Sequence, residues 1–78
     1  MNKREKLLAK AQANPVGLSF GDLETLLGQC GWVFKRQIGS HRHWMSPNGR
    51  VVPFQPDGSK AKAYQVKQFL RILENGDA

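Results

Sequence analysis

The chain has 78 residues, which is enough for one small domain but not for two. Its 12 Lys and Arg outnumber its 6 Asp and Glu, and the formal net charge is +6. The excess lies in residues 32–74, which hold eight of the basic residues and only two of the acidic ones. A surface this basic favours a polyphosphate, an anionic membrane or an acidic protein as partner.

Two features narrow the class of protein. The uncharged apolar runs are far shorter than the roughly 18 residues that a membrane span requires, so no membrane partner is expected. The single cysteine, Cys30, excludes an internal disulfide and a cysteine-rich zinc site. We therefore predict a protein of the reducing cytoplasm in which Cys30 is a small core residue.

The pattern of residues 1–17 predicts a helical extension followed by a linker. Asn2 precedes Glu5 by three residues, which is the spacing of a capping box, and a short apolar stripe ends near Asn14 and Pro15. Nothing in this segment indicates chemistry.

A domain is predicted over residues 18–76, and it begins with a second helix. Ser19 is a favoured N-cap residue, and apolar side chains recur at helical spacing from Phe20 to Cys30. Gly31 is expected to end this helix.

Three strands are predicted next. Residues 32–38 alternate with a period of two, which predicts a strand with Trp32 and Phe34 directed inward and with Arg36 and Ile38 on the same side. A Gly-Ser turn then leads into a second strand over residues 41–45.

A third strand is expected over residues 50–54, after the Asn48-Gly49 hairpin signal. Pro53 lies within it and has no N–H to donate, so this strand should lie at an edge of the sheet.

The composition of residues 55–62 indicates a loop, and the apolar spacing from Val66 to Leu73 predicts a last amphipathic helix that ends at Gly76. The predicted fold class is therefore α+β, in the order helix, helix, three antiparallel strands, helix. The helices should cover one face of the sheet and leave the other open.

Two histidines lie on the second strand, directly after the turn formed by Gly39 and Ser40. His41 and His43 are two residues apart, so their side chains share one face of a strand. If Trp44 points into the core, Arg42 lies on its side and both histidines face the opposite way. Imidazole exchanges protons near neutral pH, and among these cations it indicates RNA chemistry.

Three segments resemble the HicA toxin family, small bacterial mRNA interferases. They are the helix and strand entry over residues 20–32, the Gly39-Ser40-His41 turn, and the run from Gly58 to Leu70. The resemblance implies a fold like a double-stranded-RNA-binding domain, with residues 18–76 as the HicA-like domain and the N-terminal helix as an addition. It also implies that His41 is catalytic and that a HicB-type antitoxin masks the site.

The sequence departs from the family pattern at one position. The family often has a second histidine directly after the first, and here that position is Arg42, with His43 one residue further on.

Metal-independent cleavage of mRNA requires a base for the ribose 2′-hydroxyl and an acid for the leaving oxygen. His41 is the candidate general base and His43 is the candidate for a second acid or base. The two imidazoles could also reach one metal ion, but only Asp57 lies near in sequence as a further acidic ligand, so we expect no metal and no cofactor.

Several basic residues are candidates for RNA binding. Lys60 and Lys62 precede the last helix, whose N-terminus attracts phosphate, and Lys67 and Arg71 extend the stripe along it. The full predicted set is Lys35, Arg36, Arg42, Lys60, Lys62, Lys67 and Arg71.

Two other functions remain open at this point. A non-catalytic RNA-binding module of the same shape needs only basic side chains on a rigid scaffold. A small adaptor could use the basic face to hold an acidic protein instead.

Overall fold

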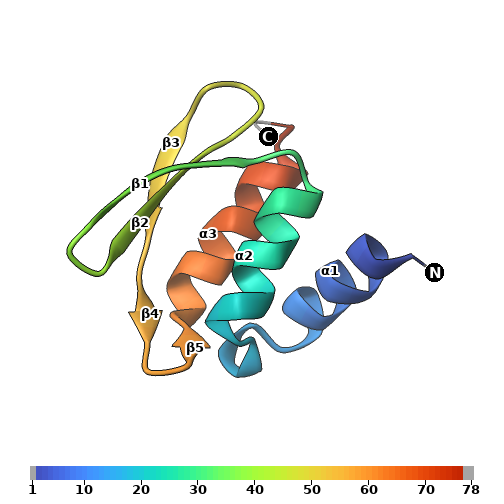
Figure 1. Ribbon diagram of the computed structural model, residues 1–78. Helices are drawn as coiled ribbons and strands as arrows, with labels where there is room; N and C mark the ends of the chain where they lie inside the picture. Colours follow the sequence, from blue (N-terminus) through green and yellow to red (C-terminus); the bar gives the residue numbers. More distant parts are fainter. Residues whose placement is uncertain (1, 77–78) are drawn as a thin grey trace.

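The computed structural model describes residues 2–76 (Figure 1). The elements, in chain order, are α1 (Lys3–Ala13), the 3₁₀ helix η1 (Pro15–Gly17), α2 (Phe20–Gln29), β1 (Val33–Ile38), β2 (His41–Met45), β3 (Val51–Phe54), β4 (Pro56–Asp57), β5 (Lys60–Ala61) and α3 (Ala63–Glu74).

Both predicted helix caps are confirmed. The side-chain oxygen of Asn2 accepts a hydrogen bond from the Glu5 N–H at 2.8 Å, and Ser19 Oγ accepts one from the Asp22 N–H at 3.0 Å. Each bond satisfies an amide that the helix itself leaves unpaired. The helix α1 packs on the rest of the molecule through the fully buried Ala11.

The strands β1, β2 and β3 form an antiparallel sheet in that order, and α2 and α3 lie on one of its faces (Figure 1). Trp32 anchors the layer between sheet and helices, with its ring centroid 6.0 Å from that of Phe54 and 5.5 Å from that of Phe69. The predicted α+β class, with helices on one face of a three-stranded antiparallel sheet, is confirmed.

One prediction about β1 is wrong, because the strand contains a β-bulge. Phe34 pairs with Trp44 but Arg36 pairs with His43, so the intervening residue is extra and the alternation shifts by one. Ile38 consequently pairs with His41. Arg36 and Ile38 therefore share the face of the histidines instead of the face of Phe34.

The open face of the sheet, defined here by the register, carries both charged and apolar side chains. Its members are Val33, Arg36, Ile38, His41, His43, Met45, Val51 and Pro53. The opposite, covered face carries Phe34, Gln37, Arg42, Trp44, Val52 and Phe54.

The strand β3 lies at an edge of the sheet, as Pro53 predicts. Residues 55–62 are not a plain loop, which corrects the sequence interpretation. They form the β4–β5 hairpin, and its backbone bonds to the segment before α2: the Ala61 N–H donates to the Leu18 carbonyl at 2.9 Å and the Phe20 N–H donates to the Ser59 carbonyl at 3.0 Å. This pairing brings the start of α3 against the start of α2.

Among residues 2–76, no helix combines the length and the apolar character that crossing a membrane would require.

Candidate active site

The turn between β1 and β2 presents His41 at the first position of β2. Gly39 adopts a φ of +60°, a conformation that costs glycine little because it has no Cβ. The turn has only two residues, so the chain reverses sharply and His41 stands exposed at this end of the sheet. It lies on the open face, where no helix covers it.

His43 shares that face but is less exposed than His41. It lies between Arg36 of β1 and Pro53 of β3. Its Nδ1 atom is buried and has no hydrogen-bond partner within residues 2–76. The two imidazoles belong to alternate residues of one strand, so their Cα atoms are about 6.5–7 Å apart.

A first set of hydrogen bonds holds the turn from the side of α3. Gln55, between β3 and β4, donates from Nε2 to Ser40 Oγ at 2.9 Å. Lys62, the N-cap residue of α3, donates from Nζ to Gln55 Oε1 at 3.1 Å. The backbone N–H of Gln55 in turn donates to Gln65 Oε1 at 2.9 Å. A lysine and a turn that are 22 positions apart in sequence are thus linked next to His41.

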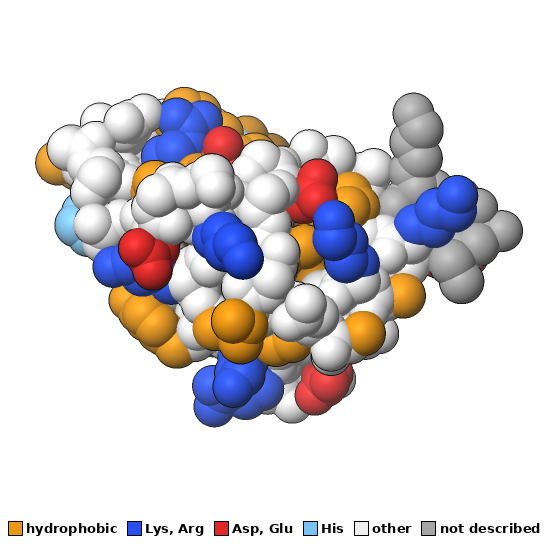
Figure 2. Space-filling model, turned by 90° about the horizontal axis from the view of Figure 1, so that it is seen from below, with side chains coloured by type: hydrophobic (Ala, Val, Ile, Leu, Met, Phe, Trp, Pro, Cys, Tyr) orange, Lys and Arg blue, Asp and Glu red, His pale blue; other side chains and the backbone are white. Residues whose placement is uncertain are grey.

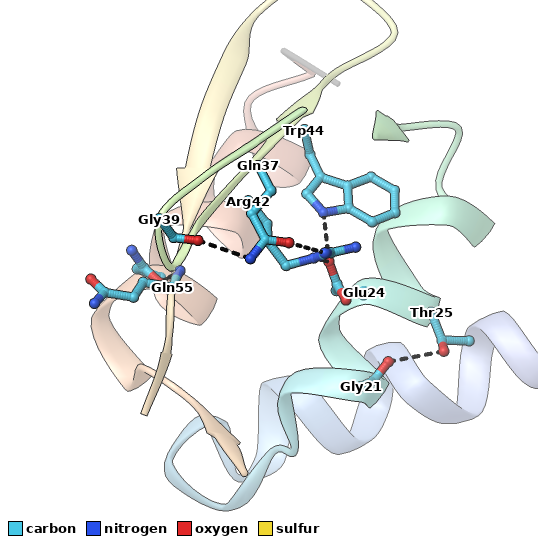
Figure 3. Close-up of polar contacts among 9 residues, drawn as sticks. Gly21, Glu24, Thr25, Gln37, Gly39, Arg42, Trp44 and Gln55 are labelled. Carbon is cyan, nitrogen blue, oxygen red and sulfur yellow. Dashed lines mark hydrogen bonds and ion pairs between the residues drawn. The ribbon is translucent and has the colours of Figure 1, made fainter. Parts of the chain in front are cut away.

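A second set holds the same turn from the side of α2 (Figure 3). Gln37 donates to the Gly39 carbonyl at 2.8 Å and accepts from Arg42 at 2.8 Å. The Arg42 guanidinium forms an ion pair with Glu24 of α2, and the same carboxylate oxygen accepts from Trp44 Nε1 at 3.0 Å. Polar contacts therefore run without a break from α2 to the turn.

Arg42 is engaged within the molecule. Besides its contacts with Glu24 and Gln37, its guanidinium carbon lies 4.3 Å from the centre of the Phe34 ring. It belongs to the covered face, opposite to His41, and its side chain is 30% exposed. These contacts hold the Arg42 guanidinium on the covered face, away from the two histidines.

The other basic residues predicted to bind RNA lie in three places. Lys35 and Arg36 are exposed on β1, Lys60 is exposed on β5 beside Lys62, and Lys67 and Arg71 are exposed on α3. Figure 2 looks at the molecule from the end that carries β4 and β5, and there the basic side chains are separated by neutral surface and by acidic side chains. The positive charge is therefore dispersed over this end.

Sequence reasoning missed the residues that fix the turn, namely Glu24, Gln37 and Gln55. Glu24 and Gln55 are common polar residues whose partners lie 18 and 15 positions away, so no local pattern marks them. Gln37 alone carries a local signal, because it lies two residues before Gly39 at the start of the turn.

Metal ligation and a cysteine nucleophile find little support in the geometry. Within the described part of the chain, no three His, Cys, Asp or Glu side chains gather closely enough to hold a metal ion. Cys30 lies half-buried at the end of α2, and burial raises the pKa of its thiol while the charge of Arg4 opposes that shift. The thiol is therefore kept protonated at neutral pH.

Comparison with known proteins identifies a family. The sequence model of a family described as the HicA toxin of bacterial toxin–antitoxin systems matches residues 20–74, from α2 through the sheet to the last residue of α3. No curated protein and no solved structure matches the chain. Since the family match spans well over half of the sequence, the chain belongs to the HicA family of bacterial toxins.

Proposed function

We propose that this HicA-family toxin is a metal-independent endoribonuclease that cleaves mRNA with His41 as general base. The observation that carries the proposal is the exposed imidazole at the start of β2, on the open face, beside a turn that hydrogen bonds hold from two sides. A fixed turn orients the base, and an open face admits a polynucleotide.

The reaction needs no group from outside the chain and the RNA. His41 accepts the proton of a ribose 2′-hydroxyl, whose oxygen attacks the adjacent phosphorus. The bond from phosphorus to the 5′-oxygen breaks, and an acid protonates that oxygen. The products are a 2′,3′-cyclic phosphate and a free 5′-hydroxyl.

His43 is the candidate for the acid, because it lies on the same face one alternate residue away. Exposed Arg36 lies across from His43 on β1, where its charge supports the phosphate as negative charge develops. Lys62, Lys60, Lys67 and Arg71 extend the positive potential from the turn towards α3, and Lys35 extends it along β1. Arg42 acts through the turn and is left out of this RNA surface.

We further propose that a HicB-type antitoxin inhibits this toxin in the cytoplasm by covering His41. The open face also carries exposed Val33, Ile38 and Val51, at 52%, 58% and 46% of their full exposure, which gives a protein partner apolar surface to bury.

The test compares His41→Ala with wild type on an RNA transcript. General base catalysis contributes about 100-fold or more, so we expect the cleavage rate of the variant to fall by at least that factor while its urea midpoint is unchanged. Gln12→Ala, an exposed change on α1, is the matched control and should cleave as wild type does. The wild-type products should carry 5′-hydroxyl ends.

Three results would contradict the proposal. Cleavage by His41→Ala at the wild-type rate would show that His41 is not the general base. Cleavage of a substrate with 2′-deoxyribose at the scissile position would show that the 2′-hydroxyl is not the nucleophile. Retardation of RNA by the wild-type chain without cleavage identifies a non-catalytic RNA-binding module instead.

A further inference from the structure

Tyr64, in the first turn of α3, is the most exposed aromatic side chain among residues 2–76, at 63% of its full exposure. The other candidates for stacking are occupied or buried. Trp32 and Trp44 are 3% and 9% exposed, and the Phe34 ring, at 39%, contacts Trp44 and has the Arg42 guanidinium over its face. An exposed phenol ring leaves apolar surface in contact with water, so the residues around Tyr64 indicate what the ring can bind.

The Tyr64 side chain lines two hollows in the surface. One has a volume of about 450 Å³ and lies along α3, where it is also lined by Gln68, Arg71 and Asn75. Arg50, from the end of the sheet, completes its charged lining. A hollow of this size falls in the range of small-ligand sites, and Arg71 contributes an exposed cationic side chain to it.

The second hollow, of about 410 Å³, lies on the other side of Tyr64. Lys60 and Lys62 line it together with Asp57 and the exposed Val16. Tyr64 thus separates two recesses, one of which is lined by Arg71 and the other by Lys60 and Lys62. An aromatic ring flanked by cations is the arrangement that binds single-stranded nucleic acid, because the ring stacks on a base and the cations bind the phosphates on either side.

The second hollow is also linked to the catalytic turn. Lys62 donates to Gln55, and Gln55 donates to Ser40, the residue before His41. Lys62 therefore lies between the turn that carries His41 and the recess beside Tyr64.

We propose that Tyr64 and the two hollows form a subsite for an unpaired nucleotide of the RNA, in which the base stacks on the phenol ring. This inference rests on the proposed function, because the RNA is the same molecule that His41 cleaves. It adds that the substrate is single-stranded on one side of the cleavage point, since a base within a duplex has no free face for the ring.

The test uses the fact that the chain contains a single tyrosine. Labelling the His41→Ala protein with 3-fluorotyrosine gives one ¹⁹F resonance, which reports on this position while the RNA stays intact. Titration with a single-stranded oligoribonucleotide of about eight nucleotides should shift that resonance with the binding curve, and a blunt RNA duplex should leave it unmoved.

Two substitutions separate stacking from charge. Tyr64→Leu removes the ring but keeps an apolar side chain that suits a helix, and Tyr64→Phe keeps the ring as the matched control. Loss of one stacked base weakens binding by roughly fivefold or more, so Tyr64→Leu should raise the Kd by at least that factor and Tyr64→Phe by less than about twofold.

Equal binding by both variants, or a resonance that only a protein antitoxin moves, would overturn the subsite even if the wild-type chain cleaves RNA. Conversely, a wild-type chain that binds the oligoribonucleotide through Tyr64 without cleaving any RNA would support the subsite and overturn the nuclease. The two proposals can therefore fail separately.

Discussion

The two faces of β2 differ in how far their side chains are engaged within the molecule. On the covered face, Arg42 and Trp44 both donate to the Glu24 carboxylate and pack against Phe34. On the open face, His41 is exposed and His43 has a buried nitrogen without a partner within the described chain. Side-chain contacts hold β2 on the covered face and leave the two imidazoles on the open face. Substitutions on the covered face should therefore lower stability, and substitutions on the open face should leave stability nearly unchanged.

The largest effect on stability is expected for Trp44→Ala. It removes a buried indole from the layer between sheet and α2, and such truncations cost about 3–5 kcal/mol in free energy of unfolding. His43→Ala is the comparison on the open face, and it should change the free energy of unfolding by less than about 1 kcal/mol. Urea denaturation followed by circular dichroism measures both, and similar losses would break the distinction between the faces.

A smaller loss is expected for Glu24→Ala. The change leaves the partly buried guanidinium of Arg42 and the Trp44 N–H without their shared acceptor, at a cost of about 2–3 kcal/mol. Glu24→Gln keeps an acceptor but not the charge and should lose about half as much. Urea midpoints measure the difference, and a neutral Glu24→Ala would mean that α2 does not hold the hairpin through this carboxylate.

The sequence alone was sufficient where a local signal decides the structure. Ser19 caps α2 and the Gly39-Ser40 turn starts β2 at His41, because each depends on residues close together in the chain. The bulge in β1 could not be foreseen, because residues 32–38 alternate regularly and only the pairing with β2 reveals the extra residue.

The same reasoning explains which parts of the site could be predicted. The Gly39-Ser40-His41 triplet is local, and the resemblance that it helps to carry implies that His41 is catalytic. Glu24 and Gln55 were not predicted, because their partners lie 18 and 15 positions away and meet them only after the layers pack. The β4–β5 hairpin was interpreted as a loop for a similar reason, since its backbone is stabilised by residues before α2.

A moderate effect on activity is expected for Gln55→Ala. The change breaks the link from Lys62 to Ser40 and lets the turn that carries His41 move, so kcat for RNA cleavage should fall about tenfold. Gln55 contacts the turn only through its side chain, and its hydrogen bond to Ser40 is exposed to solvent, so the urea midpoint should barely change. A kcat equal to that of Gln12→Ala would show that the turn needs no support from the side of α3.

The smallest effect is expected for the contribution of the Cys30 thiol to stability. Burial raises the pKa of the Cys30 thiol above its ordinary value of 9.0, against the opposing charge of Arg4. The folded state therefore favours the protonated thiol, so its stabilising contribution is complete below pH 9.0 and is lost as the pH rises through the folded pKa.

Two measurements check this. The stability advantage of wild type over Cys30→Ala should shrink above pH 9.0, and iodoacetamide should alkylate Cys30 more slowly in the folded chain than in urea. Equal alkylation rates would mean that water reaches the thiol freely.

The interruptions at both edges of the sheet have a consequence for the free toxin. β1 is broken by its bulge and β3 by Pro53, so neither edge offers a continuous row of backbone donors and acceptors to a strand from another molecule. A small chain that exposes valine and isoleucine side chains on one face would otherwise be prone to fibril growth. Aggregation by strand addition is thereby discouraged during any interval in which the protein stands without a partner.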